Sequence, residues 1–138
     1  MSKPFNFIET LINKRIACNC SGSSNHITAC LKNNNIISIG VNDEYRHSEV
    51  DAILKLKFLR HKLKKPVKLE ILVIKVSSTR QLGLSKPCIH CLIALSSIPK
   101  TGYIITDIYY SNENGDIIKT TLKTLLNEEH HISYGNRN

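Results

Sequence analysis

The sequence predicts an α/β fold in which a mixed sheet of about five strands carries helices on its faces. Two observations support this fold class: hydrophobic patterns of helical and strand period alternate along the chain, and residues 68–77 are almost entirely apolar over their middle. With 138 residues, of which 41% are hydrophobic and 22% charged, the chain has the size of one domain with a small core. We therefore expect residues 1–138 to form a single domain.

The first third of the chain predicts a helix followed by a β-hairpin. From Pro4 to about Cys18 apolar residues recur at helical spacing, which indicates an amphipathic helix lying on the sheet. Its expected apolar stripe consists of Phe5, Ile8, Leu11, Ile12 and Ile16. Residues 27–31 and 36–41 are short β-branched runs, and Lys32-Asn33-Asn34-Asn35 between them tolerates left-handed backbone, so the two runs are expected to pair as a hairpin.

The middle of the chain predicts a second helix and a central strand. The helix runs from about His47 to Leu59. Its expected buried stripe consists of Val50, Ile53, Leu54 and Phe58. The nearly continuous apolar run that follows, Lys68 to Ser77, is typical of a strand that is buried on both faces.

The last third predicts a helix, two strands and a short final helix. Pro87 favours the first turn of a helix over residues 88–96, which presents Cys88, Cys91, Leu92 and Leu95 on one face. Residues 102–110 and 117–121 are expected to be strands joined by a turn that contains Asn-Gly, which favours an antiparallel pair. A short helix is expected from Leu122, which gives the order α-β-β-α-β-α-β-β-α.

The chain is basic because of one segment. It has 19 Lys and Arg against 11 Asp and Glu, a formal net charge of +8. Seven of the basic residues lie between Lys55 and Lys68, and without them 12 of the 19 remain against 11 acidic ones. This basic stretch is interpreted first as a solvated helix end, where cations suit the helix dipole, and second as a contact for phosphates of a nucleotide or nucleic acid.

Composition also indicates where the protein acts. No apolar run approaches the roughly 20 residues that span a bilayer, and the first residues do not resemble a secretory signal. We therefore expect a cytoplasmic protein with no membrane partner, placed in the host cytoplasm if its source is a virus. The five cysteines, an odd number, argue against a disulfide framework. Cys18, Cys20 and Cys30 are interpreted as buried or loop thiols because their spacing matches no zinc pattern.

Two segments carry residues that can bind a metal ion or take part in catalysis. They are His47-Ser48-Glu49 and Pro87-Cys88-Ile89-His90-Cys91. Cys88 and Cys91 are three residues apart at a helix start, so both sulfurs can hold one ion. Two thiolates and the His47 imidazole make a three-ligand zinc site with a fourth position for water, one ion per chain. Glu49 is then the candidate catalytic residue that acts on this water, although an ideal helix places positions 47 and 49 about 200° apart. Taken singly, these residues also fit a buried histidine and inert thiols.

The pattern H-x-E followed by P-C-x-x-C resembles the signature of zinc-dependent nucleobase deaminases. The order of elements from about Phe5 to Tyr110 is also similar to that family, and Ile39-Gly40-Val41-Asn42 is similar to its G-x-N at the end of the second strand. The chain most resembles cytidine and deoxycytidylate deaminase-like proteins, including uncharacterised viral and fungal members. The resemblance implies a cytidine-deaminase-like three-layer sandwich.

The resemblance implies zinc-dependent hydrolytic deamination of a cytosine nucleoside or nucleotide (cytidine, deoxycytidine or dCMP), with Glu49 moving the protons. It implies that Asn42 contacts the substrate sugar or base and that the backbone N–H of Ser48, which stands where the family usually has alanine, holds the base. Further substrate contacts are expected from Pro87 and from Tyr109 or Tyr110, one of which should be core. A homo-oligomer is expected because family members commonly assemble.

Two other functions stay open. The first is a polynucleotide or tRNA base deaminase, favoured if the basic stretch lies on the face of the pocket. The second is a non-catalytic, zinc-stabilised binding or assembly protein. Substrate class is also open: an antiparallel pair around Asn114-Gly115 resembles cytidine deaminases, whereas the loop from Asn42 to His47 lacks an element of the free-nucleoside enzymes. The scarcity of aromatic residues, 6%, argues against a stacking groove for a single strand.

Overall fold

A computed structural model describes residues 5–17, 25–33, 35–42, 47–59, 67–77, 79–97 and 102–128. Three sequence predictions lie outside these residues. They are the thiols of Cys18 and Cys20, the loop at residues 43–46, and residues 60–66 of the basic stretch. Both interpretations of the basic stretch, as a solvated helix end and as a contact for phosphates, therefore stay predictions.

Ten helices and strands make up the described part of the chain. In chain order they are α1 (Phe5–Ala17), β1 (His26–Lys32), β2 (Asn35–Val41), α2 (Ser48–Leu59), β3 (Val67–Val76), β4 (Leu82–Gly83), α3 (Ile89–Ser96), β5 (Tyr103–Ser111), β6 (Ile117–Thr120) and α4 (Leu122–Asn127). The predicted α/β order is confirmed, with the short strand β4 as an addition.

The strands form one mixed sheet in the order β2-β1-β3-β5-β6, and β4 pairs with the end of β3. The sheet thus has six strands rather than the predicted five, because Leu82 and Gly83 pair with Val76 and Lys75. β3 and β5 are parallel, whereas β1 pairs antiparallel with both β2 and β3. The predicted antiparallel return after the Asn-Gly turn is confirmed as the pair β5–β6, with Gly115 at a φ of +82°.

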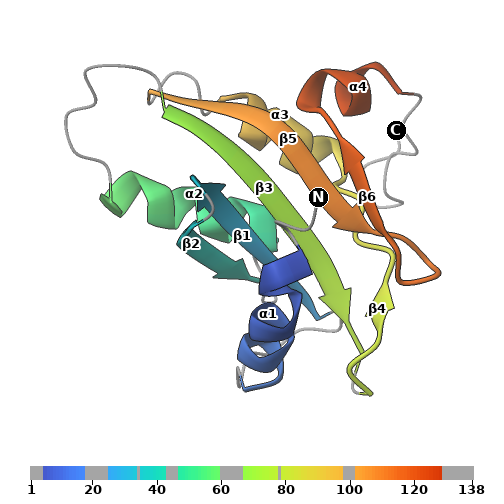
Figure 1. Cartoon of the computed structure of the whole chain (residues 1–138). Helices are drawn as coiled ribbons and strands as arrows, with labels where there is room; N and C mark the ends of the chain where they lie inside the picture. Colours follow the sequence, from blue (N-terminus) through green and yellow to red (C-terminus); the bar gives the residue numbers. More distant parts are fainter. Residues whose placement is uncertain are drawn as a thin grey trace.

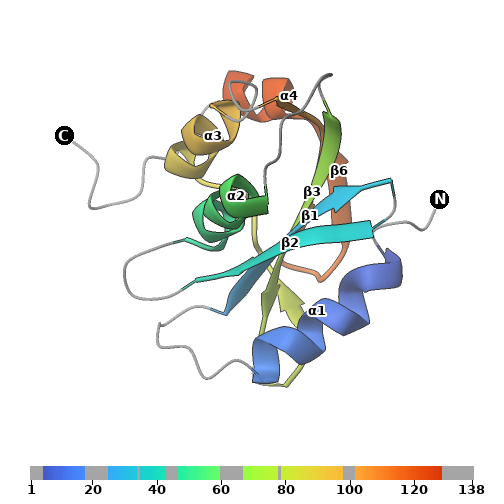
Figure 2. The same ribbon diagram turned by 90° about the vertical axis from the view of Figure 1, so that its left-hand side faces the viewer.

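Helices cover both faces of the sheet, which gives three layers. Figure 2 shows α1 on one side of the strands and α2 and α3 on the other, and Figure 1 shows the same arrangement with α1 in front. Side chains of β3 alternate between the two cores, so the prediction of a central strand buried on both faces is confirmed. Ile71 and Val73 pack in the α2/α3 cluster, whereas Leu72 and Ile74 pack in the α1 cluster.

The buried stripes of the first two helices differ from the predicted ones. In α1 the charged residue Arg15 is 4% exposed, whereas Ile16, expected in the stripe, is 47% exposed. In α2 the fully buried apolar residues are Ala52, Ile53 and Leu56, and Val50 and Leu54 are only partly buried. Of the predicted α2 stripe, only Ile53 is fully buried among the side chains described.

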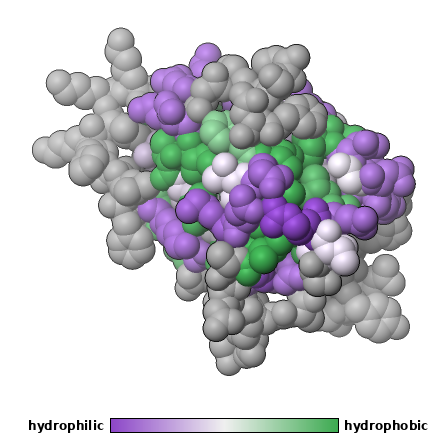
Figure 3. All heavy atoms as spheres, turned by 60° about the horizontal axis from the view of Figure 1, so that its bottom comes forward, coloured by the Kyte–Doolittle hydropathy of each residue, from purple (hydrophilic) through white to green (hydrophobic). Residues whose placement is uncertain are grey.

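The surface of the described residues is mixed. On the face shown in Figure 3, hydrophilic side chains lie across a partly exposed apolar surface. Five large hydrophobic side chains are exposed in the described part of the chain: Ile16, Leu84, Ile93, Ile104 and Leu126. None of the helices described has the length and apolar character needed to cross a membrane.

Candidate metal centre and active site

The start of α2 is fixed by close packing on β2. A Cβ atom built on Gly40 would lie 2.3 Å from both the Ala52 backbone nitrogen and the Ser48 carbonyl oxygen. Only glycine allows a strand to approach a helix backbone this closely. Gly40 therefore sets the distance between β2 and the first turns of α2, from which two of the candidate site residues emerge.

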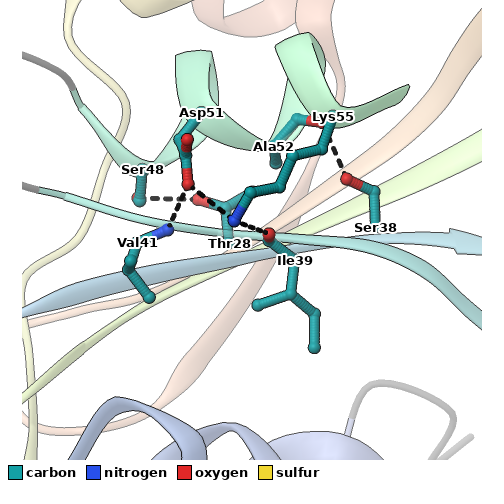
Figure 4. A network of polar contacts seen from close by, with 8 residues as sticks. All are labelled: Thr28, Ser38, Ile39, Val41, Ser48, Asp51, Ala52 and Lys55. Atoms are coloured by element: carbon teal, nitrogen blue, oxygen red, sulfur yellow. Dashed lines mark hydrogen bonds and ion pairs between the residues drawn. The ribbon is translucent and has the colours of Figure 1, made fainter. Parts of the chain in front are cut away.

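Polar contacts hold the same two elements together (Figure 4). The Ser38 hydroxyl donates to the Ala52 carbonyl at 2.7 Å, and the Val41 N–H donates to the Asp51 carboxylate at 3.0 Å. The Lys55 ammonium bridges that carboxylate at 3.1 Å and the Ile39 carbonyl at 3.0 Å. Because the Ser38 hydroxyl and the Val41 N–H are bonded to α2, the orientation of α2 on the sheet is specified as well as its distance.

His47 lies at the N-terminal boundary of α2. Its carbonyl accepts the N–H of Asp51 at 3.0 Å, while the residue itself precedes the helix. His47 and Glu49 lie close enough for their charges to interact, although positions 47 and 49 would be about 200° apart on an ideal helix.

A buried serine anchors the segment before α3. The Ser85 hydroxyl donates to the Val73 carbonyl at 2.7 Å, and the Ser85 N–H donates to the Ser111 carbonyl at 2.8 Å, so the segment is tied to both β3 and β5. Pro87 is buried one residue before Cys88, the N-cap of α3. The helix predicted over residues 88–96 is thus confirmed to within one residue, and Pro87 rigidifies the chain that enters it.

The structure brings His47, Cys88 and Cys91 together. The His47 Nδ1 atom lies 3.1 Å from the Cys91 sulfur and 3.6 Å from the Cys88 sulfur. All three ligand atoms lie within 4.8 Å of one another. Around a tetrahedral zinc ion, with Zn–S about 2.3 Å and Zn–N about 2.0 Å, such atoms are about 3.5–3.8 Å apart. The soft sulfur donors and the imidazole therefore fit zinc in chemistry, and their ligand atoms are gathered closely enough to hold one ion.

The two thiols have opposite electrostatic behaviour. A hydrogen bond from the Cys91 thiol lowers the pKa of Cys88 to about 5, against the opposing effect of burial. That same bond, together with burial, raises the pKa of Cys91. Cys88 also caps the N-terminus of α3, where the helix dipole favours an anion. The lowered pKa of Cys88 favours its thiolate, which is the form that ligates a metal ion.

Glu49 lies beside this group. It is 5% exposed, and its carboxyl lies close enough to Cys91 for the charges of the two groups to interact. Burial raises the pKa of Glu49 above its ordinary value, while hydrogen bonds from its backbone and from Ser48 oppose that rise. A raised pKa moves a carboxyl in the direction of neutral pH, which favours a group that must both accept and return a proton.

A pair of buried hydroxyls, one of which contacts Glu49, was not predicted from the sequence. The Ser48 hydroxyl lies 3.2 Å from Glu49 Oε1 and 2.8 Å from the Thr28 hydroxyl on β1. Because a carboxylate only accepts, Ser48 donates to Glu49 and accepts from Thr28. Both hydroxyls are at most 1% exposed. In the sequence, only Ser48 itself could have indicated this pair, because it stands where the family that the chain resembles usually has alanine.

Asn42 lies at the end of β2 and is 6% exposed. Its side-chain oxygen accepts the His26 N–H at 2.9 Å and a guanidinium N–H of Arg15 at 3.4 Å. His26 pairs with Lys75 at the edge where β1 begins and β3 ends. Burial, with smaller effects of Lys75 and His47, lowers the pKa of His26 to about 4. A neutral histidine therefore lies at the edge of the sheet near the metal-binding group, and the sequence prediction did not include it.

The two tyrosines of β5 lie on opposite faces of the sheet. Tyr109 is 4% exposed in the α1 cluster, and its hydroxyl donates to Glu70 at 3.3 Å. Tyr110 is partly buried against the α2/α3 cluster and lies close enough to Lys86 for their charges to interact. Of the two, only Tyr110 is on the face of the candidate site.

No second metal-binding group occurs among the described residues. Cys30 is fully buried in β1, and burial raises the pKa of its thiol to about 12. His90 is exposed on α3 and is not part of the group around His47. Cys30 therefore behaves as an inert core thiol, whereas Cys18 and Cys20 lie outside the described residues.

The arrangement defines a class of protein: a mixed α/β sandwich with a His-Cys-Cys group at the starts of two helices on one face. No protein-family model matches the sequence, and no curated protein matches it. Solved structures do match. The apo dCMP deaminase of the cyanophage S-TIM5 is similar over 80% of this chain and 82% of its own, with 17% identity and a TM-score of 0.50.

The same cyanophage enzyme in complex with dCMP and dUMP gives 16% identity and a TM-score of 0.51 over 79% of this chain and 80% of its own. RibD of Acinetobacter baumannii aligns 80% of this chain with 28% of its own length, at 15% identity and a TM-score of 0.48. The chain has the cytidine-deaminase-like fold that the sequence predicted.

Proposed function

We propose that the protein is a zinc-dependent hydrolytic deaminase that converts a cytosine nucleoside or nucleotide to the uracil form and releases ammonia. One observation carries the proposal: a buried carboxyl, Glu49, lies beside a His-Cys-Cys group whose ligand atoms are all within 4.8 Å of one another. A structural zinc site closes its coordination with a fourth protein ligand, whereas three ligands and an adjacent carboxyl suit hydrolysis.

His47, Cys88 and Cys91 would hold the ion. When bound, zinc supplies Lewis acidity and a nucleophilic water at neutral pH. Glu49 removes a proton from the attacking water and delivers protons to N3 of the ring and to the departing amine. The overall change is cytosine plus water to uracil plus ammonia, with no oxidant or reductant.

Buried hydroxyls and the sheet edge would orient the reactants. Ser48 holds one oxygen of Glu49, which leaves the carboxyl in a single orientation. The Ser48 N–H and Pro87 are proposed to contact the base, and Asn42 the sugar or base. Tyr110, rather than Tyr109, is the proposed aromatic contact, because Tyr109 packs beneath α1.

Both free nucleosides and nucleotides are included in the proposed substrate class. The antiparallel pairing of β5 and β6 is the arrangement that the resemblance associates with free-nucleoside enzymes. The cyanophage neighbour, in contrast, was solved with dCMP and dUMP. We propose a small-molecule pyrimidine as the partner, and a homo-oligomer as the assembly.

The test measures bound zinc and then ammonia release from cytidine, deoxycytidine, dCMP and a cytosine-containing oligonucleotide. The decisive variant is Glu49→Gln, which keeps the shape of the side chain. Glu70→Gln is its matched control, because Glu70 is a partly buried glutamate that contacts Tyr109 in the α1 cluster. We expect about one zinc per chain in all three proteins and turnover lost only in Glu49→Gln.

Each alternative has its own outcome. Turnover restricted to the oligonucleotide would replace the proposal with a polynucleotide deaminase. Zinc at about one per chain without Glu49-dependent turnover on any substrate would contradict the enzyme and favour a zinc-stabilised binding protein.

A further inference from the structure

Arg15 is buried where the helical pattern of α1 predicts an apolar residue. Leu11 and Ile12 are 0% and 6% exposed, and Arg15, on the same face, is 4% exposed. The neighbouring Ile16 is 47% exposed. A guanidinium keeps its charge at every physiological pH, and removing it from water costs several kcal/mol. The core alone would favour the apolar neighbour, so the position of Arg15 calls for a reason outside core packing.

The contacts of Arg15 indicate that reason. Its guanidinium donates to the side-chain oxygen of Asn25 at 3.1 Å and to that of Asn42 at 3.4 Å. The same Asn42 oxygen accepts the His26 N–H at 2.9 Å. Arg15 on α1 thus joins the residue before β1 to the residue after β2.

These contacts also determine the orientation of the Asn42 carboxamide, that is, whether its oxygen or its nitrogen faces Arg15 and His26. Guanidinium and backbone N–H groups only donate, so the Asn42 atom that meets both must be the oxygen. The amide nitrogen consequently points away from Arg15 and His26. If the donors were lost, the carboxamide could rotate by 180° and exchange a donor for an acceptor.

Asn42 is on the sheet edge where the candidate active site lies. Gly40, two residues earlier, packs on the backbone of Ser48 and Ala52 in α2. His26, which bonds Asn42, is close enough to His47 for their charges to interact. An amide donor at this edge is therefore next to the proposed substrate position.

We propose that Arg15 is a positioning residue: it holds the oxygen of Asn42 so that the amide nitrogen donates to an oxygen acceptor on the nucleoside part of the substrate. This inference rests on the proposed function, in which Asn42 contacts the sugar or base. Arg15 acts through Asn42 and does not itself touch the substrate.

The test measures dCMP affinity by calorimetry in the zinc-loaded Glu49→Gln protein, in which substrate is not consumed. Arg15→Met added to this protein should weaken dCMP binding by about tenfold, the effect of one misplaced polar group. Asn42→Asp should have a similar effect, since it keeps an oxygen toward Arg15 but loses the amide donor. Arg80→Met is the matched control, because Arg80 also bonds α1, at Glu9 and Asn13, without contacting Asn42.

A double-mutant cycle separates positioning from a general loss of structure. If Arg15 acts through Asn42, Arg15→Met should cause no further loss of dCMP affinity in an Asn42→Ala background. Arg15→Lys should restore part of the affinity because it keeps a donor. If Arg15→Met fails to fold, Asn42→Asp decides: unchanged dCMP affinity in that variant overturns the inference.

The remaining outcomes are distinguishable. Unchanged affinity in folded Arg15→Met, or additive losses in the cycle, overturns the role of Arg15 while the proposed function stands. Failure of the parent Glu49→Gln protein to bind any cytosine nucleoside or nucleotide overturns the proposed function, and the inference with it.

Discussion

Replacing Gly40 by alanine should damage both the fold and the metal site, because Gly40 sets the distance between β2 and α2. The added methyl would lie 2.3 Å from two backbone atoms of α2 and 2.9 Å from the Cα atom of Ala52. Carbon atoms approach other heavy atoms to roughly 3.5 Å. Since backbone atoms cannot rotate away as a flexible side chain can, α2 must move from the sheet by about 1 Å.

The expected magnitude follows from that displacement. Overpacking of a core costs about 1–3 kcal/mol, and a clash with a helix backbone belongs at the upper end, about 3 kcal/mol. For a domain of this size such a loss lowers the melting temperature by roughly 10 °C. The displacement also moves His47 relative to Cys88 and Cys91, so zinc affinity should fall by about 10–100-fold, as for changes in groups that orient metal ligands.

Two measurements separate these effects. Urea unfolding in excess chelator gives the free energy of unfolding without the contribution of metal, and competition with a chromophoric chelator gives zinc affinity. Gly83→Ala is the control, because its methyl would meet only the Lys75 side chain, at 3.6 Å and 4.0 Å. If Gly40→Ala unfolds at the same urea concentration as the wild type and binds zinc as tightly, the argument that Gly40 positions α2 is wrong.

Three further predictions concern other residues. Burial lowers the pKa of His26 to about 4, so between pH 6.5 and 4 the unfolded chain binds a proton that the folded chain does not. The free energy of unfolding of the chelated protein should therefore decrease as pH falls through this window, and His26→Gln should flatten that slope in urea titrations. Thr28→Val should lower kcat by about tenfold at unchanged KM, because Ser48 loses the donor that fixes its hydroxyl, whereas Thr28→Ser should keep near wild-type kcat. Cys88→Ser should lower bound zinc well below one per chain by atomic absorption, and equal zinc in this variant would show that Cys88 is not a ligand.

Patterns of single elements allowed most of the fold to be predicted. The alternation of helical and strand periods predicted a mixed sheet with helices on its faces, and the Asn-Gly turn predicted the antiparallel pair β5–β6, with Gly115 at positive φ. β4 was missed because a two-residue strand has no hydrophobic period. It exists only because the backbone of Leu82 and Gly83 pairs with the end of β3.

The helix stripes were mispredicted where polar residues are buried. On α2 the buried face includes the polar residues Ser48 and Glu49. A prediction based on apolar residues alone therefore selected Val50 and Leu54 and missed Leu56. On α1 the same kind of error occurred, because Ile16 was predicted to be buried and the charged residue Arg15 is buried instead. Both errors occur where polar or charged side chains are buried in contact with candidate site residues.

For the candidate site, motif spacing predicted the residues but not how they are held. His47, Cys88 and Cys91 meet as the H-x-E and P-C-x-x-C pattern led us to expect. The contact of Thr28 with Ser48, and that of Arg15 with Asn42, join residues 20 and 27 positions apart. Such pairs depend on the register of β1 against its neighbours and on the placement of α1, which no local pattern contains.

We propose that His47, Cys88 and Cys91 hold a zinc ion on which Glu49 depends for hydrolysis of a cytosine amine. The most direct test strips the protein with a chelator, restores about one equivalent of zinc, and follows the conversion of cytidine and dCMP to their uracil forms in wild type and Glu49→Gln. We expect activity that disappears on stripping and returns with zinc in the wild type. We also expect at least a 100-fold lower rate for zinc-loaded Glu49→Gln. Equal rates in the two zinc-loaded proteins, or turnover that survives complete removal of zinc, would contradict it.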